Sequence, residues 1–195
     1  MTDQAVVISP ANKALALAEA VDFPSLELVR LSPDNPLLAR LAMADEDDIV
    51  GSTWHDFSQW MEATGSAEER LSELRRDYYY LFLRTERDLS VYLHDWYKDL
   101  PAHEVLSGLR QFLDSVELSK ATGFRSGQDH ISLVLEALAH LSLADAGEAT
   151  RFKKHYVEPW FGVFASRLGS EARSPFYLAA AKLAGGLERD LEALA

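Results

Sequence analysis

Residues 123–143, GFRSGQDHISLVLEALAHLSL, decide the fold class of this chain. Between residues 131 and 141, apolar side chains recur at steps of three and four, which is the period of one face of an α-helix. Leu133 and two alanines widen that face until little polar surface is left. The stretch therefore predicts a buried helix at the centre of a helical domain.

The rest of the chain also predicts helices. A short helix is expected over residues 11–21, and aromatic residues at helical spacing indicate another over 54–64. Ser66 and Glu69 have the spacing of a capping box, and the helix that they open is expected to run to Phe82. Residues 90–98 fit either a helical turn or a strand-like segment.

Three more helical segments are expected in the second half. One follows Pro101, one spans 146–168 and is kinked or split at Pro159, and one follows Pro175. No alternating run of β-branched residues indicates a sheet. The fold class is therefore expected to be all-α, a single bundle-like helical domain over residues 1–195. A hinge between its N- and C-terminal helical parts is expected near 121–127.

The composition is that of a folded, acidic protein. Of the 195 residues 48% are hydrophobic, which favours one sizeable core over disorder. Asp and Glu total 31 against 19 Lys and Arg, giving a formal charge of −12. This balance disfavours nucleic acid and anionic membranes as partners and suits a basic partner.

Several classes of protein are excluded or disfavoured by what the sequence lacks. There is no cysteine, which excludes disulfides and thiolate chemistry. We find no signal peptide at the N-terminus and no apolar run near the roughly 18 residues of a membrane span. A cytoplasmic location is expected.

Asp129 and His130 stand at the mouth of the apolar helix, beside a loop that contains Gly127. One interpretation is a polar pair at the mouth of a binding groove. The other is helix capping, because Ser126 and Asp129 have capping-box spacing and an acid in the first turn complements the helix dipole. On residue spacing alone, helix capping is the favoured interpretation.

His130, Glu136 and His140 raise the alternative of a metal site. Glu136 and His140 share one helix face, but His130 lies on another side, and the chain has no H-E-x-x-H motif. No Gly-x-Ser-x-Gly elbow, Walker loop or dinucleotide-binding fingerprint is present. Neither a catalytic constellation nor a cofactor is predicted.

Four short motifs, taken in order, carry a family resemblance. They are YYYLF at 78–82, SVYL at 90–93, Gln128-Asp129-His130 with the apolar run behind it, and the landmarks EPW at 158–160 and SPFY at 174–177. The ordered set resembles the TorD/DmsD family of cytoplasmic chaperones for molybdenum-cofactor oxidoreductases. These are also called redox enzyme maturation proteins and are related to the nitrate reductase delta-subunit (NarJ) chaperones. The resemblance covers residues 70–184.

The resemblance implies a chaperone and not an enzyme. Such a protein binds the N-terminal twin-arginine leader and the apo form of a molybdoenzyme catalytic subunit, assists cofactor insertion and delays export. The residues that the resemblance places in the leader-binding groove are Asp129, His130 and Gln128, with Tyr78, Leu81, Phe82 and Tyr92 as its apolar wall. A basic pair followed by an apolar stretch needs such carboxylates beside aromatic side chains. The chaperone itself is expected to be a monomer or homodimer.

The chain departs from the family pattern in two places. Ser126-Gly127 replaces the usual Glu-Pro before the Asp-His pair, and residues 84–89 are shorter than the loop of relatives. Two other functions stay open at this point. One is a helical adaptor without leader specificity, and the other is a small metal-dependent hydrolase that uses His130, Glu136 and His140.

Overall fold

The computed structural model describes residues 9–30, 49–84, 89–118 and 129–193, and within them the regular elements are helices. The prediction of an all-α fold is confirmed. The elements are α1 (Pro10–Val21), α3 (Ile49–Ala63), α4 (Ala67–Tyr78), a π-helix η1 (Tyr79–Leu83), a 3-10 helix η2 (Leu93–Trp96), α5 (Ala102–Ser115), α6 (Ile131–Ala144), α7 (Ala146–Tyr156), α8 (Phe161–Glu171) and α9 (Pro175–Ala193).

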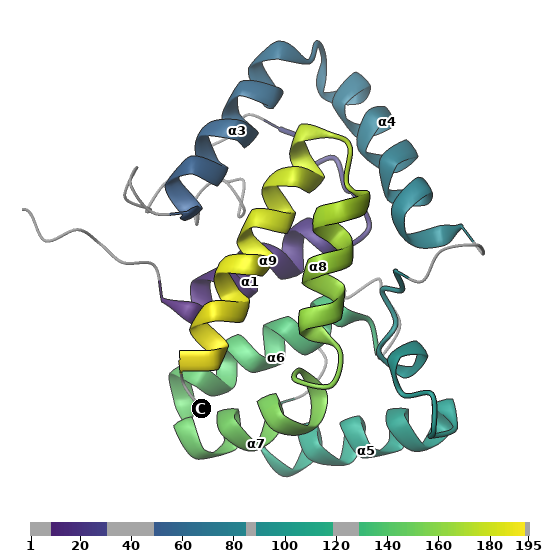
Figure 1. Ribbon diagram of the computed structural model, residues 1–195, viewed down its shortest axis with the longest axis vertical. Helices are drawn as coiled ribbons and strands as arrows, with labels where there is room; N and C mark the ends of the chain where they lie inside the picture. The colour runs from purple at the N-terminus through teal and green to yellow at the C-terminus, as the bar shows by residue number, and fades with distance from the viewer. Residues whose placement is uncertain (1–8, 31–48, 85–88, 119–128, 194–195) are drawn as a thin grey trace, which may run out of the picture.

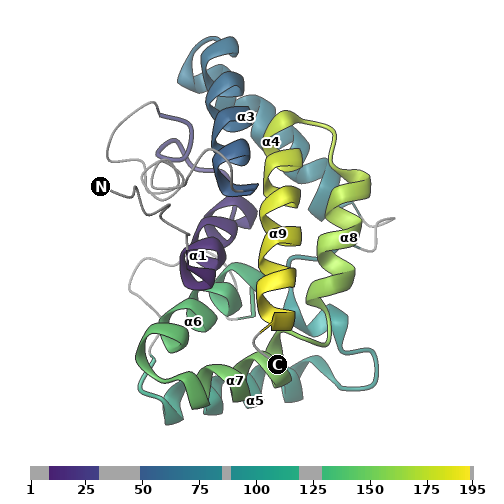
Figure 2. The same ribbon diagram turned by 60° about the vertical axis from the view of Figure 1, so that its left-hand side comes forward.

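Two helices, α1 and α9, connect the others by packing against several of them. α1 lies between α6 and α9, and α9 also packs against α3 and α8. Figures 1 and 2 show α3 and α4 at one end of the molecule and α5, α6 and α7 at the other, with α9 running between the two ends. The helix α6, which was predicted to be central, is buried as expected, but it lies towards one end of the molecule (Figure 1), where it packs against α1 and α7.

The central place of α1 was not evident from its sequence. Its buried residues include five alanines, which give the helix no strong amphipathic stripe. Alanine lets neighbouring helices approach closely on more than one side, so α1 fits between α6 and α9. Leu17, Val21 and a buried Lys13, which pairs with Asp190 of α9 at 3.0 Å, complete the contact.

The α4–η1 segment confirms one prediction and changes another. The capping box is present, with the Ser66 amide donating to Glu69 at 2.6 Å and the Glu69 amide donating to Ser66 Oγ at 3.2 Å. The α-helix ends at Tyr78, however, and the chain continues to Leu83 as a π-helix instead of an α-helix. The wider turn places Leu81 and Phe82 in the core and leaves Tyr79 and Leu83 exposed.

Pro159 splits the predicted 146–168 helix. α7 ends at Tyr156, a turn follows, and α8 begins at Phe161. Proline has no amide hydrogen for the helix ladder, which accounts for the break. The turn buries Trp160 against Phe164, with ring centroids 5.5 Å apart, so the break contributes to the core.

One prediction about the whole chain remains open, and a second can be compared with the described helices. The hinge near 121–127 lies outside the described residues, so the division of the single domain into two helical parts stays a prediction. Among the helices of the described ranges, none combines the length and apolarity that a membrane span requires.

Candidate functional site

The start of α6 is fastened to the segment before η2 by backbone hydrogen bonds. The Leu93 amide donates to the Asp129 carbonyl at 2.8 Å, and the Ile131 amide donates to the Val91 carbonyl at 2.8 Å. These two bonds form an isolated antiparallel bridge between Tyr92 and His130. Residues 90–98, which fit two interpretations from sequence, therefore combine a strand-like bridge with a 3-10 turn.

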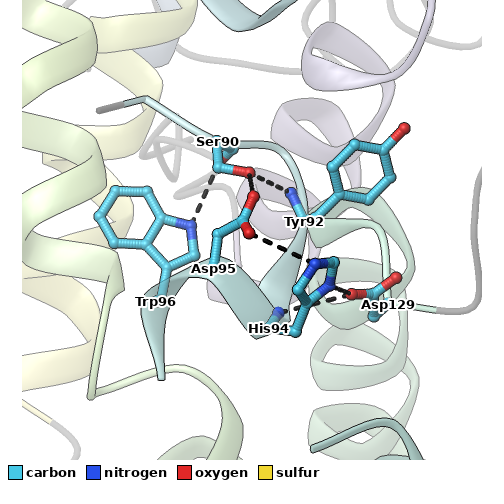
Figure 3. Close-up of polar contacts among 6 residues, drawn as sticks. All are labelled: Ser90, Tyr92, His94, Asp95, Trp96 and Asp129. Atoms are coloured by element: carbon cyan, nitrogen blue, oxygen red, sulfur yellow. Dashed lines mark hydrogen bonds and ion pairs between the residues drawn. The ribbon is translucent and has the colours of Figure 1, made fainter. Parts of the chain in front are cut away.

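Asp129 is 5% exposed and faces η2 instead of the first turn of α6. Its Oδ2 accepts hydrogen bonds from Nδ1 of His94 and from the His94 amide, the latter at 3.4 Å. The other ring nitrogen of His94 lies 3.3 Å from Asp95 Oδ1, and Ser90 Oγ donates to the second oxygen of Asp95. Figure 3 shows this chain of contacts, which runs from the buried Asp129 to the half-exposed Asp95.

His130 is the N-cap of α6 and is 2% exposed. Its Nδ1 accepts from the Ser132 amide at 3.2 Å, so in the neutral ring the proton is on Nε2, which contacts the Tyr78 hydroxyl at 3.3 Å. Burial lowers the pKa of His130, although the carboxylates of Asp22 and Asp129 act against this shift. Burial and the Asp22 carboxylate also raise the pKa of Tyr78.

The capping interpretation of the motif needs a correction. The side chain that caps α6 is His130, not Asp129, and Asp129 precedes the helix. Histidine is an unusual cap, so the capping-box spacing pointed to Ser126 and Asp129 instead. Ser126 and Gln128, the other residues invoked for the cap and the groove, lie outside the described residues.

The predicted apolar wall divides into buried and exposed members. Tyr78, Leu81 and Phe82 are buried, and the Tyr78 ring packs on Phe82 with centroids 4.9 Å apart. Tyr92 is 38% exposed and stands edge-on to the His130 ring at 5.9 Å.

Asp22 and Phe23, at the end of α1, join this surface and were not identified from sequence. Phe23 is 49% exposed and packs edge-on against the Tyr78 ring at 5.4 Å. Two exposed aromatic rings, Phe23 and Tyr92, therefore flank the buried Tyr78–His130 pair. Asp22-Phe23-Pro24 reads in the sequence as a helix stop, and only the tertiary fold brings it to the motif.

The three proposed metal ligands, His130, Glu136 and His140, do not lie close together. His130 caps the start of α6, whereas the exposed His140 lies ten residues along the helix, a rise of about 15 Å. Within the described ranges, no group of three His, Cys, Asp or Glu side chains is placed to hold a metal ion.

A large cavity lies elsewhere, between α3 and α9. It measures about 700 Å³ and is lined by Trp60, Ala63, Leu178 and Ala181, among others. Its two charged groups, Asp56 and Lys182, form an ion pair with each other. This groove therefore offers no net charge to attract a basic ligand.

Comparison with known proteins agrees with the motifs. The chain is 30% identical over 129 residues to the chaperone protein TorD of Shewanella pealeana, an alignment that covers 60% of this chain. The aligned part spans 58% of the relative's length. The family model described as nitrate reductase delta subunit matches residues 44–166, which contain α3 to α7, the first half of α8 and the Asp129–His130 pair. The chain therefore belongs to the nitrate reductase delta subunit family, to which the TorD-like chaperones are related.

Proposed function

We propose that this protein is a cytoplasmic maturation chaperone. In this role it binds the leader and the apo form of a molybdenum-cofactor oxidoreductase subunit and delays export until the cofactor is inserted. Membership of the family and the similarity to a protein named TorD support the chaperone role. The client, the leader and the step that is assisted are our proposal.

The observation that carries the proposal is the surface around the Tyr78–His130 pair. It combines exposed aromatic rings, Phe23 and Tyr92, with the carboxylates of Asp22 and Asp95. A twin-arginine leader presents two guanidinium groups followed by apolar side chains, which such a surface can bind by charge-assisted hydrogen bonds and ring contacts. The net charge of −12 also favours the approach of a basic peptide.

The residues expected from the resemblance take different roles in this proposal. Tyr92 contacts the leader directly because it is exposed. The buried residues position this surface: Asp129 holds His94 and therefore Asp95, while His130 and Tyr78 support the two exposed rings. Leu81 and Phe82 form the core behind them.

Titration with a synthetic leader tests the proposal. The peptide carries two consecutive arginines followed by an apolar stretch, and a Lys-Lys version serves as control. We expect saturable binding in the micromolar range that weakens as salt is raised from low to moderate concentration. The Lys-Lys peptide should bind more weakly, because lysine does not reproduce the bidentate contact of arginine with a carboxylate.

Two results would contradict the proposal in different ways. Equal binding of both peptides would indicate a surface that selects charge alone, as a general helical adaptor does. No binding to several such leaders would remove leader recognition and leave the adaptor as the better description.

A further inference from the structure

A hollow of about 360 Å³ lies next to the surface around the Tyr78–His130 pair. Asp95 and Ser90 line it and also belong to the contacts that lead to Asp129. Figure 3 shows Asp95 between the two regions, with the Trp96 ring on one side and His94 and Asp129 on the other. The remaining lining comes from Trp96, Lys98, Pro159, Val163 and Arg167.

One side of the hollow is apolar and preformed. Val163 of α8 is 50% exposed, and Pro159 lies in the turn before that helix. The Trp96 indole is fixed, because its Nε1 donates to the Ser90 carbonyl at 3.2 Å and its ring packs 6.1 Å from that of Trp160. An apolar side chain that entered would meet a wall already in place, so little ordering would oppose binding.

The charged side chains differ on the two sides of Asp95. Besides Asp95, the charged side chains that line the hollow are the positive Lys98 and Arg167. Asp129 and Asp95 bring negative charge to the other side, where both contact His94. A guanidinium group is therefore better placed at the side of Asp95 that faces His94 than beside Lys98 and Arg167. The hollow suits an apolar side chain and peptide carbonyl groups instead.

We infer that the hollow receives the first apolar side chains of the leader, while the arginine pair stays at the carboxylates of Asp95 and Asp22, away from Lys98 and Arg167. This inference rests on the proposed function and adds the register in which the peptide lies. Val163 and Trp96 then determine specificity for the residues that follow the arginines.

Two matched variants test the inference. Val163→Gln makes the wall of the hollow polar without changing the net charge. Leu143→Gln makes the same kind of change at a helix position that is 70% exposed and lines none of the cavities described above. We expect Val163→Gln to weaken leader binding about tenfold, the effect of losing one buried aliphatic contact, and Leu143→Gln to leave it unchanged.

A peptide variant completes the test. A leader in which serines replace the first two apolar residues should bind the wild-type chain about tenfold more weakly, and Val163→Gln should add little further loss. If the wild type binds the leader but the Val163→Gln variant binds it with the same affinity as the Leu143→Gln variant, the inference about the hollow is overturned. The proposed function then stands. If the wild type binds no leader, the proposed function is overturned and this inference with it.

Discussion

Asp129 and His94 are joined twice, since the Asp129 carboxylate accepts from both the ring and the backbone amide of His94. His94 in turn approaches Asp95 at 3.3 Å, so a buried acid holds an exposed one in place. The Asp-His motif is therefore part of the structure of the surface that we propose for the leader. Its own side chains are almost fully buried.

Replacing both Asp129 and His130 by alanine is expected to destabilise the fold. The change removes the partners of His94, the Ser132 amide and the Tyr78 hydroxyl, and should lower the free energy of unfolding by about 2–4 kcal/mol. Urea denaturation measures this quantity. The exposed Glu148–Arg151 pair serves as control, because alanine at both positions should change stability by less than about 1 kcal/mol. A double variant as stable as the wild type would contradict the supporting role of the motif.

The Asp95→Asn variant tests the effect of this carboxylate on leader binding without a change in the fold. Asparagine keeps the shape of the side chain and its contact with Ser90, but it removes a half-exposed negative charge beside His94. Leader affinity should fall about three- to tenfold, with an unchanged helical spectrum by circular dichroism.

Asp56→Asn is the matched control for this loss of charge. Asp56 lines the α3–α9 groove and pairs with Lys182, away from the proposed site. The general attraction of a basic peptide is reduced equally in the two variants. Equal loss of affinity in both would show that Asp95 acts through long-range charge and not through contact.

Much of the fold could be predicted from local pattern. The apolar period of α6, the capping box at Ser66 and the break at Pro159 each depend on neighbours within a few residues. The π-helix η1 could not be predicted in this way, because its sequence, YYLFL, fits an α-helix equally well by local spacing.

The site was harder to predict because its geometry depends on contacts between distant segments. Asp129 and His94 are 35 residues apart in the chain, and Asp22-Phe23 reaches the motif only through the packing of α1 against α6. Arg70 is a second residue whose environment could not be predicted from its neighbours in the sequence. From sequence it is one more charge in α4, but in the fold it is buried and donates to the carbonyls of Met61, Thr64 and Gly65 at the end of α3.

His130 should make stability depend on pH below its ordinary pKa of 6.5. Burial lowers its pKa in the folded state, and a proton on Nδ1 would face the donating Ser132 amide. The unfolded state therefore binds the proton more readily, so this contribution to stability is complete above about pH 6.5 and decreases as pH falls below it.

Comparison with His130→Asn isolates this contribution. Asparagine is a good N-cap whose side-chain oxygen can accept from the Ser132 amide, and it does not titrate. The difference in unfolding free energy between wild type and variant should shift against the wild type between pH 7.5 and pH 5. Effects of the many carboxylates, common to both proteins, cancel in this difference. A difference that stays constant with pH would show that His130 titrates alike in the folded and unfolded states.

Tyr177 and Tyr78 should respond in opposite ways to removal of the hydroxyl group. The Tyr177 hydroxyl is buried and has no hydrogen-bond partner within the described residues, and burial raises its pKa well above the usual value. Tyr177→Phe is therefore expected to leave stability unchanged or to raise it by about 1 kcal/mol. The Tyr78 hydroxyl contacts Nε2 of the buried His130, so Tyr78→Phe should lower stability by about 1 kcal/mol. Both changes remove one oxygen atom from a buried ring, and urea denaturation compares them directly. A clear loss of stability in Tyr177→Phe would show that this hydroxyl makes a stabilising contact in solution.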